Sequence, residues 1–253
     1  MSKAGNEQKP VMDPGSAFTL LLSCPGGLPR SRVYVDFGVS YDRIPHPDAD
    51  LEESINEIWT CQVEKKPSLY NGKKFRYGGY TLHHAEGGNK SSLCLQLGLT
   101  DYRTFVGTNL SPLWEDFLVS SEEVGVSSHQ TNKISTDHEV LNGKISQEMF
   151  EGIIREVVEE IGVPAESLTD PIFIGISRRN LNVRPTAFFF INCSLGSHEI
   201  QQLYSRAQDG YESIQLYDVS MEELLKMSER MPGCHRGGFA LYEQMMKASQ
   251  GDL

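Results

Sequence analysis

The stretch REVVEEIGV, residues 155–163, constrains the fold of this chain more than any other segment. It ends a run of apolar residues at helical spacing, which consists of Met149, Phe150, Ile153, Ile154, Val157, Val158 and Ile161. Such a stripe predicts an amphipathic helix that packs one face against a core. Gly162 and Pro164 follow directly and predict that the helix stops there.

Three carboxylates lie on this helix outside the apolar stripe. Glu156, Glu159 and Glu160 are separated by three and four positions, so their side chains are neighbours on one side of the helix. Like charges at this spacing cost about 0.2 to 0.5 kcal/mol per pair in an isolated helix, and a cation between them removes that cost. A solvated acidic surface is the ordinary interpretation of such a pattern. The alternative is a site for a divalent metal that acts on diphosphates.

The nine residues resemble the second half of the Nudix box, G-x5-E-x7-R-E-U-x-E-E-x-G-U, where U is apolar. The first half departs from this pattern, because Gln147 and Leu141 stand where the box has Glu and Gly. Glu148 and Gly143 lie nearby but out of register. The resemblance implies an α/β fold, a Nudix-type α/β/α sandwich with a mixed sheet, and hydrolysis of nucleoside diphosphates linked to another moiety.

Further segments are similar to the UDP-sugar-hydrolysing, UDP-glucose pyrophosphatase-like branch of the family, whose members also have a degenerate first half of the box. These segments are LGLTDYRTFVGTN at 97–109, CPGGLP at 24–29, the pair Ile58 and Trp59, and residues 173–195. The resemblance covers roughly residues 17–110 and 145–245.

This resemblance implies Mg²⁺-dependent hydrolysis of UDP-glucose or UDP-galactose to UMP and sugar 1-phosphate. Glu156, Glu159 and Glu160 are the expected catalytic residues, with Glu156 and Glu160 as ligands of Mg²⁺ and Glu159 supporting them through water. Tyr70 and Tyr102 are the expected substrate-binding residues, because a flat ring suits stacking on uracil. Each tyrosine has an equally weighted alternative, in which it packs at a strand end.

The resemblance fails between about residues 110 and 145, where the sheet is expected to be incomplete. Residues 120–144 are polar, have no strand pattern and predict a disordered loop. We infer a shortened member of the family that lacks an internal segment before the box helix. Two functions therefore stay open: a nucleotide-sugar diphosphatase, or an impaired form that binds uridine nucleotides or a protein partner without turnover.

Composition limits the partners. The 253 residues carry a net charge of −11 and are 39% hydrophobic, and no apolar run is long enough to span a bilayer. We therefore expect a soluble, cytoplasmic protein without targeting segment, nucleic-acid partner or membrane partner. The five cysteines are odd in number and widely spaced, which is typical of reduced thiols. The sequence does not indicate an oligomeric state.

Periodicity predicts the elements of one domain over residues 17–248 after a disordered segment 1–16, and the resemblance implies that this domain is Nudix-like. The expected strands are 17–23, 75–83, 92–99, 171–177, 186–194 and 210–219, with 186–194 central because it is almost continuously apolar. A helix capped by Asp48 or Asp50 is expected to run to Lys65, and further helices are expected at 197–207, 220–227 and 238–247.

Overall fold

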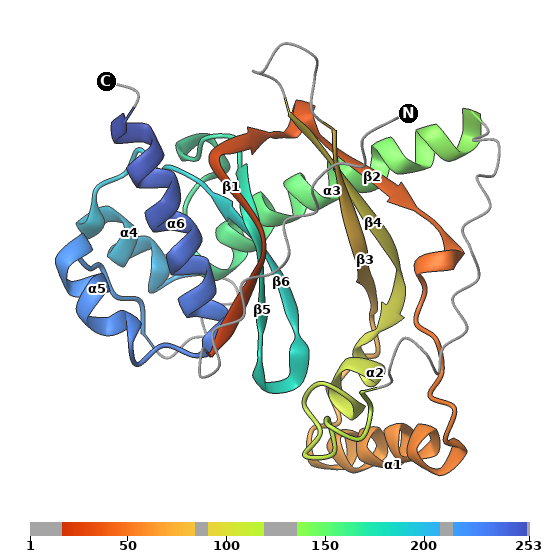
Figure 1. Ribbon diagram of the computed structural model, residues 1–253. Coiled ribbons are helices and arrows are strands. Elements are labelled where there is room, and N and C mark those ends of the chain that lie inside the picture. Colours follow the sequence, from red (N-terminus) through yellow and green to blue (C-terminus); the bar gives the residue numbers. More distant parts are fainter. Residues whose placement is uncertain (1–16, 84–90, 119–135, 208–214, 252–253) are drawn as a thin grey trace. The chain divides into compact units, whose positions relative to one another are not determined.

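The computed structural model describes residues 17–83, 91–118, 136–207 and 215–251 (Figure 1). Its strands are β1 (Phe18–Pro29), β2 (Val33–Phe37), β3 (Lys73–His83), β4 (Ser92–Asp101), β5 (Ile172–Arg179) and β6 (Pro185–Phe190). Its helices are α1 (Ala49–Lys65), α2 (Tyr102–Gly107), α3 (Thr136–Ile161), α4 (Ser197–Tyr204), α5 (Met221–Ser228) and α6 (Gly233–Gly251). The predicted α/β class is confirmed.

The chain divides into two compact units, where the sequence predicted one domain. One unit contains β1, β5, β6, α4, α5 and α6, and the other contains β2, β3, β4, α1 and α2. Helix α3 belongs to both, since the division falls between Met149 and Phe150. Each unit has a sheet of three strands.

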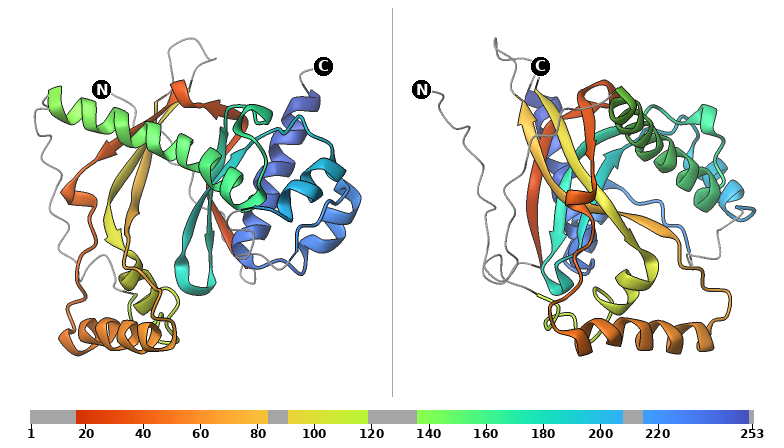
Figure 2. Two further views of the ribbon diagram at one scale, coloured as in Figure 1. Left: turned by 180° about the vertical axis from the view of Figure 1, so that it is seen from behind. Right: turned by 90° about the vertical axis from the view of Figure 1, so that its right-hand side faces the viewer.

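The sheet of the first unit is antiparallel, with strand order β1-β5-β6. Helix α6 packs along β1 and β5, and it lies beside β1 in both views of Figure 2. The contact is a core of Ile174, Leu241 and Met245, all buried. Gly175 of β5 has φ +150°, and a Cβ there would lie 2.4 Å from the Leu22 carbonyl oxygen of β1 and 2.7 Å from Leu241 Cδ2 of α6, so this position requires glycine.

The second half of α3 covers the opposite face of this sheet. The ring of Phe150 packs edge-on against Phe189 of β6, with centroids 5.2 Å apart. Phe189 in turn packs against Phe173 of β5 at 5.5 Å. This unit therefore has helix, sheet and helix layers, which is the predicted α/β/α arrangement.

The prediction that residues 186–194 form a central strand is wrong. Strand β6 lies at the edge of the sheet, and β5 is central. The apolar run has another cause: Phe189 faces α3, while Phe188 and Phe190 pack against the core beneath α6. An edge strand between two helices has both faces covered, so its side chains give no sign of its open edge.

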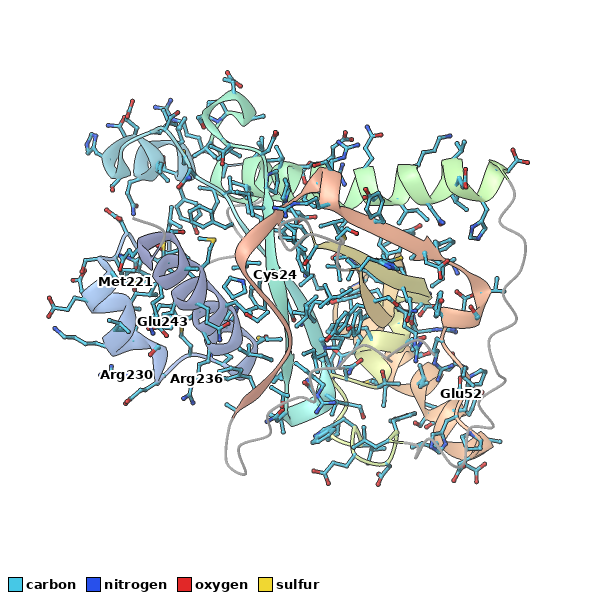
Figure 3. The ribbon with its side chains drawn as sticks, turned by 45° about the horizontal axis from the view of Figure 1, so that its top comes forward. Cys24, Glu52, Met221, Arg230, Arg236 and Glu243 are labelled. Atoms are coloured by element: carbon cyan, nitrogen blue, oxygen red, sulfur yellow. The ribbon has the colours of Figure 1, made fainter. Side chains whose placement is uncertain are left out.

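The second unit has a mixed sheet with the order β2-β4-β3. Strands β2 and β4 are parallel, and β3 and β4 are antiparallel. Helix α1 begins as predicted, because the Asp48 carboxylate accepts hydrogen bonds from the N–H groups of Asp50 and Leu51. Glu52 of α1, labelled in Figure 3, accepts hydrogen bonds from both terminal nitrogens of Arg43.

Helix α3 begins at Thr136, within the segment that the sequence predicted to be a loop to residue 144. Two contacts with β2 hold its first half: Asn142 Oδ1 accepts from Phe37 N–H (3.0 Å), and Ser146 Oγ donates to the Val33 carbonyl (3.0 Å). Polar contacts between distant segments leave no trace in apolar periodicity. The rest of the predicted loop, residues 120–135, lies outside the described residues.

Strand β2 and helix α2 were not predicted from the sequence, and the structure also differs from the prediction near residue 215. The helices at α4, α5 and α6 are confirmed, including the capping box of Ser220 and Glu223 at α5. Residues 215–219 form no strand, and the start of the strand predicted at 210–219 lies outside the described residues. The predicted disordered segment 1–16 also lies outside them. Of the helices in the described ranges, none combines the length and the apolar character of a membrane span.

Candidate functional site

The helix that carries the three carboxylates ends where the sequence predicted. Ile161 is the last residue of α3, and Gly162 follows in the left-handed region with φ +83°. Its N–H donates to the Val158 carbonyl (2.9 Å), as at the ends of many helices. A Cβ on Gly162 would lie 2.8 Å from the Leu203 carbonyl of α4, so the turn both needs glycine and is closely packed.

Glu156, Glu159 and Glu160 lie on the last turns of α3, on consecutive turns of one side. Glu156 is exposed, while Glu159 and Glu160 are half-buried. The apolar stripe beside them is only partly covered: Phe150 is buried, but the stripe residues from Ile153 to Ile161 are half-buried. The three carboxylates therefore lie at the surface of the first unit, where they remain accessible to solvent.

The donor set suits a metal that keeps much of its hydration. Among the described residues, no group of three or more His, Cys, Asp or Glu side chains converges in the way that a closed metal site requires. Mg²⁺ does not need such a cage, because one or two carboxylates, water and substrate phosphates complete its octahedron. Glu156 and Glu160, four positions apart, fit that requirement.

Tyr102 is the first residue of α2, and Asp101 before it caps the helix by accepting from Thr104 N–H (2.8 Å). Burial acts to raise the pKa of Asp101, but hydrogen bonds from Thr104 and the charge of Arg103 hold that pKa below its usual value. The Tyr102 ring packs edge-on against Trp59 (5.9 Å between centroids). Lys74 Nζ lies 5.8 Å from the Tyr102 ring centroid. The ring is therefore a fixed part of an aromatic cluster.

Lys74 is a neighbour that the sequence did not suggest. It lies on β3, and the pairing of Lys73 with Asp101 brings it beside the end of β4. A lysine within about 6 Å of a tyrosine ring interacts with the negative potential of the ring face. The register of β3 and β4 determines which side chains meet there.

Tyr70 lies in the segment between α1 and β3 and is 82% exposed. Its neighbours Asn71 and Gly72 attach this segment to the start of α2: Asn71 Oδ1 accepts from Arg103 N–H (2.8 Å), and the Gly72 carbonyl accepts from Tyr102 N–H (2.9 Å). The two tyrosines thus belong to one local structure in the second unit. The three glutamates belong to the first unit.

A hollow of about 500 Å³ lies where the chain leaves α3 and passes α4. It is lined by Pro164, Leu195, Glu199, Gln202, Leu203, Ser205 and Arg206. None of the predicted site residues lines it.

The α/β fold with the REVVEEIGV helix against its sheet is the arrangement that the resemblance to diphosphate hydrolases implied. Comparison with known proteins gives the family. The chain is 47% identical to Nudix hydrolase 9 of Arabidopsis thaliana over 98% of this chain and 96% of the relative. It is 28% identical to the uridine diphosphate glucose pyrophosphatase NUDT22 of Homo sapiens, over 95% and 96% of the two chains. The chain belongs to the Nudix hydrolase family, whose members generally use divalent metals.

Both alignments are longer than this chain. The alignment with the plant relative spans 301 positions, whereas this chain has 253 residues, so at least 48 positions of that alignment have no counterpart here. The alignment with human NUDT22 spans 297 positions and has the same property. This agrees with the predicted loss of an internal segment. No family profile matches the chain.

Proposed function

We propose that this protein hydrolyses UDP-sugars, UDP-glucose or UDP-galactose, to UMP and sugar 1-phosphate with Mg²⁺ as cofactor. The observation that carries the proposal is the trio Glu156, Glu159 and Glu160 at the end of α3, in a chain with UDP-glucose pyrophosphatases among its relatives. The five cysteines form no disulfide, which supports a reducing compartment such as the cytoplasm.

In this proposal Glu156 and Glu160 hold the metal, which when bound neutralises the diphosphate and activates water for attack on phosphorus. Glu159, which is half-buried, orients water in the same shell. Arg155 is exposed and adjacent to the trio, and we assign it to pairing with a carboxylate that keeps the helix end in place. The chain's own contribution is thus to present acceptor oxygens on a rigid helix.

Tyr70 and Tyr102 are proposed to receive the uracil ring. The exposed ring of Tyr70 has a face available for stacking, which contributes about 1 to 3 kcal/mol per base in single-stranded nucleic-acid complexes. The Tyr102 ring is held by Trp59 and Lys74, so it offers a fixed edge or a single face. Tyr70 is therefore the better candidate for stacking, and Tyr102 for positioning.

The test is hydrolysis of UDP-glucose by the full chain with Mg²⁺, beside the variants Glu156→Gln and Glu160→Gln. We expect each variant to lose turnover by a factor on the order of 10² or more, because the amide cannot supply the anionic oxygen. Glu139→Gln is the matched control, since Glu139 is an exposed glutamate in the first turn of the same helix. Equal turnover in all four proteins would contradict the proposal.

A second function is favoured by the internal gap: binding of uridine nucleotides, or of a protein partner, without turnover. The same experiment distinguishes the two. If UDP raises the melting temperature of the chain while UDP-glucose stays intact, the protein is a binder. Turnover that depends on Glu156 and Glu160 identifies the enzyme.

A further inference from the structure

Strand β5 presents two consecutive arginines to opposite faces of the first unit's sheet. Ser177 faces α6, because its Oγ donates to the Cys234 carbonyl (3.5 Å). Side chains alternate along a strand, so Arg178 faces the other way, toward the face that Phe150 covers. Arg179 faces α6 again, and its Cγ lies 3.3 Å from the position of a Cβ on Gly233.

Arg178 lacks an acceptor. Its Nε is buried without a hydrogen-bond partner, and its guanidinium forms no hydrogen bond or ion pair with another described residue. Arg103 is the informative comparison: its Nε is also buried and unsatisfied, but its terminal nitrogens contact Asn56 (2.7 Å) and Asp101 (3.7 Å). A desolvated donor of a permanent cation is costly unless something accepts its hydrogen bonds.

The neighbouring strands do not supply that acceptor. Thr19 of β1 is paired with Arg178 and is buried, and its hydroxyl is hydrogen-bonded to Asn180 Oδ1 (2.7 Å) and not to Arg178. Pro185 is the partner on β6 and has an apolar side chain. The positions beside Arg178 across both strands therefore carry no carboxylate, in a chain with 34 acidic residues.

The turn after Arg178 is strained and firmly held. Asn182 and Val183 have φ +66° and +45°, and a β-branched residue in the left-handed region is a conformational outlier. Asn180 N–H donates to the Ala17 carbonyl (3.1 Å), and Arg179 N–H donates to the Arg184 carbonyl (2.9 Å). Strain that the surrounding structure maintains is concentrated at ligand sites, where it fixes side chains in advance.

We propose that Arg178 binds a phosphate oxygen of the nucleotide ligand. The planar guanidinium matches phosphate in a bidentate geometry, and a chain of net charge −11 needs local cations to hold a diphosphate. The assignment of the ligand as a uridine diphosphate rests on the proposed function. The assignment of the contact to phosphate rests on Arg178 itself.

Calorimetric titration of the full chain with UDP and with inorganic pyrophosphate, at one Mg²⁺ concentration, tests this. We expect Arg178→Gln to weaken the binding of both by about tenfold or more, since both carry the diphosphate. Arg178→Lys keeps the positive charge but loses the planar guanidinium. Its affinity should lie between those of the wild type and Arg178→Gln. Arg179→Gln, one residue away on the opposite face, is the matched control and should bind both as the wild type does.

Several results would overturn the proposal: absence of pyrophosphate binding by the wild type, unchanged affinity in Arg178→Gln, or a loss confined to UDP. An equal loss in Arg179→Gln would also overturn it, because general damage to the hairpin would then explain the effect. Binding that depends on Arg178 in a protein that leaves UDP-glucose intact would support this inference while the proposed hydrolysis fails.

Discussion

At the scale of single residues, the best-defined electrostatic contact lies outside the candidate site. Glu52 accepts from both terminal nitrogens of Arg43 and from His46 N–H (2.9 Å). These contacts attach the segment before α1 to the helix. The hydrogen bonds from Arg43 hold the pKa of Glu52 below its usual value, although partial burial acts in the opposite direction.

The pH dependence of this contact follows from the lowered pKa. A carboxylate with a lowered folded-state pKa contributes stability above its unfolded pKa of about 4.3, and this is lost as pH falls through the folded value. We expect Glu52→Gln to lower stability at pH 7 by about 1 kcal/mol, and the difference from wild type to shrink below about pH 4. Thermal unfolding followed by the fluorescence of Trp59, on the same helix, measures it.

Glu57→Gln is the control for this prediction. Glu57 is an exposed carboxylate of α1, so its replacement should leave the unfolding midpoint nearly unchanged at both pH values. A deficit in Glu52→Gln that is the same at pH 7 and pH 3 would mean that shape, not charge, explains the effect.

At the scale of elements, local signals predicted well and contacts between elements did not. Asp48, Ser220 and Gly162 each fixed a helix end, because caps and stops depend on a few neighbouring residues. The place of β6 and the start of α3 depend on partners distant in the chain, so the sequence placed both wrongly. The glutamate trio was visible as spacing, whereas Arg178 became notable only through its burial.

Gly143 inside α3 and Gly162 directly after it should respond in opposite ways to the same substitution. Gly162→Ala places a Cβ at φ +83° and 2.8 Å from the Leu203 carbonyl, so we expect a loss of about 1 kcal/mol or more. Gly143→Ala adds a Cβ in open space inside the helix and should gain up to about 1 kcal/mol. Chemical denaturation of both variants measures the change in the free energy of unfolding and its sign.

The two glycine substitutions should also differ in their effect on turnover, because only Gly162 is adjacent to the carboxylates. Gly162 ends the turn that carries Glu159 and Glu160. Distortion there should lower the turnover of UDP-glucose at 25 °C even though the variant remains folded. Gly143→Ala is distant in sequence from the trio and should keep full turnover. Similar losses of turnover in both variants would show that the helix end does not position the site.

At the scale of the whole molecule, the resemblance identified the family but not the division into two units. The box helix was recognised from nine residues, yet the same helix continues into the second unit through Asn142 and Ser146. Periodicity reports which face of an element is covered, and it does not report which unit covers it. The predicted metal residues and the predicted uracil residues consequently belong to different units.

Each unit has its own core, so we expect them to unfold separately. Leu241 is 1% exposed in the core beneath α6, and Leu241→Ala should destabilise the first unit by about 2 to 5 kcal/mol. Both tryptophans, Trp59 and Trp114, lie in the second unit, so their fluorescence reports on that unit alone. Leu241→Ala should therefore lower the midpoint seen by circular dichroism and leave the fluorescence midpoint in place. Equal shifts in both signals would contradict this expectation and show that α3 couples the two units into one cooperative structure.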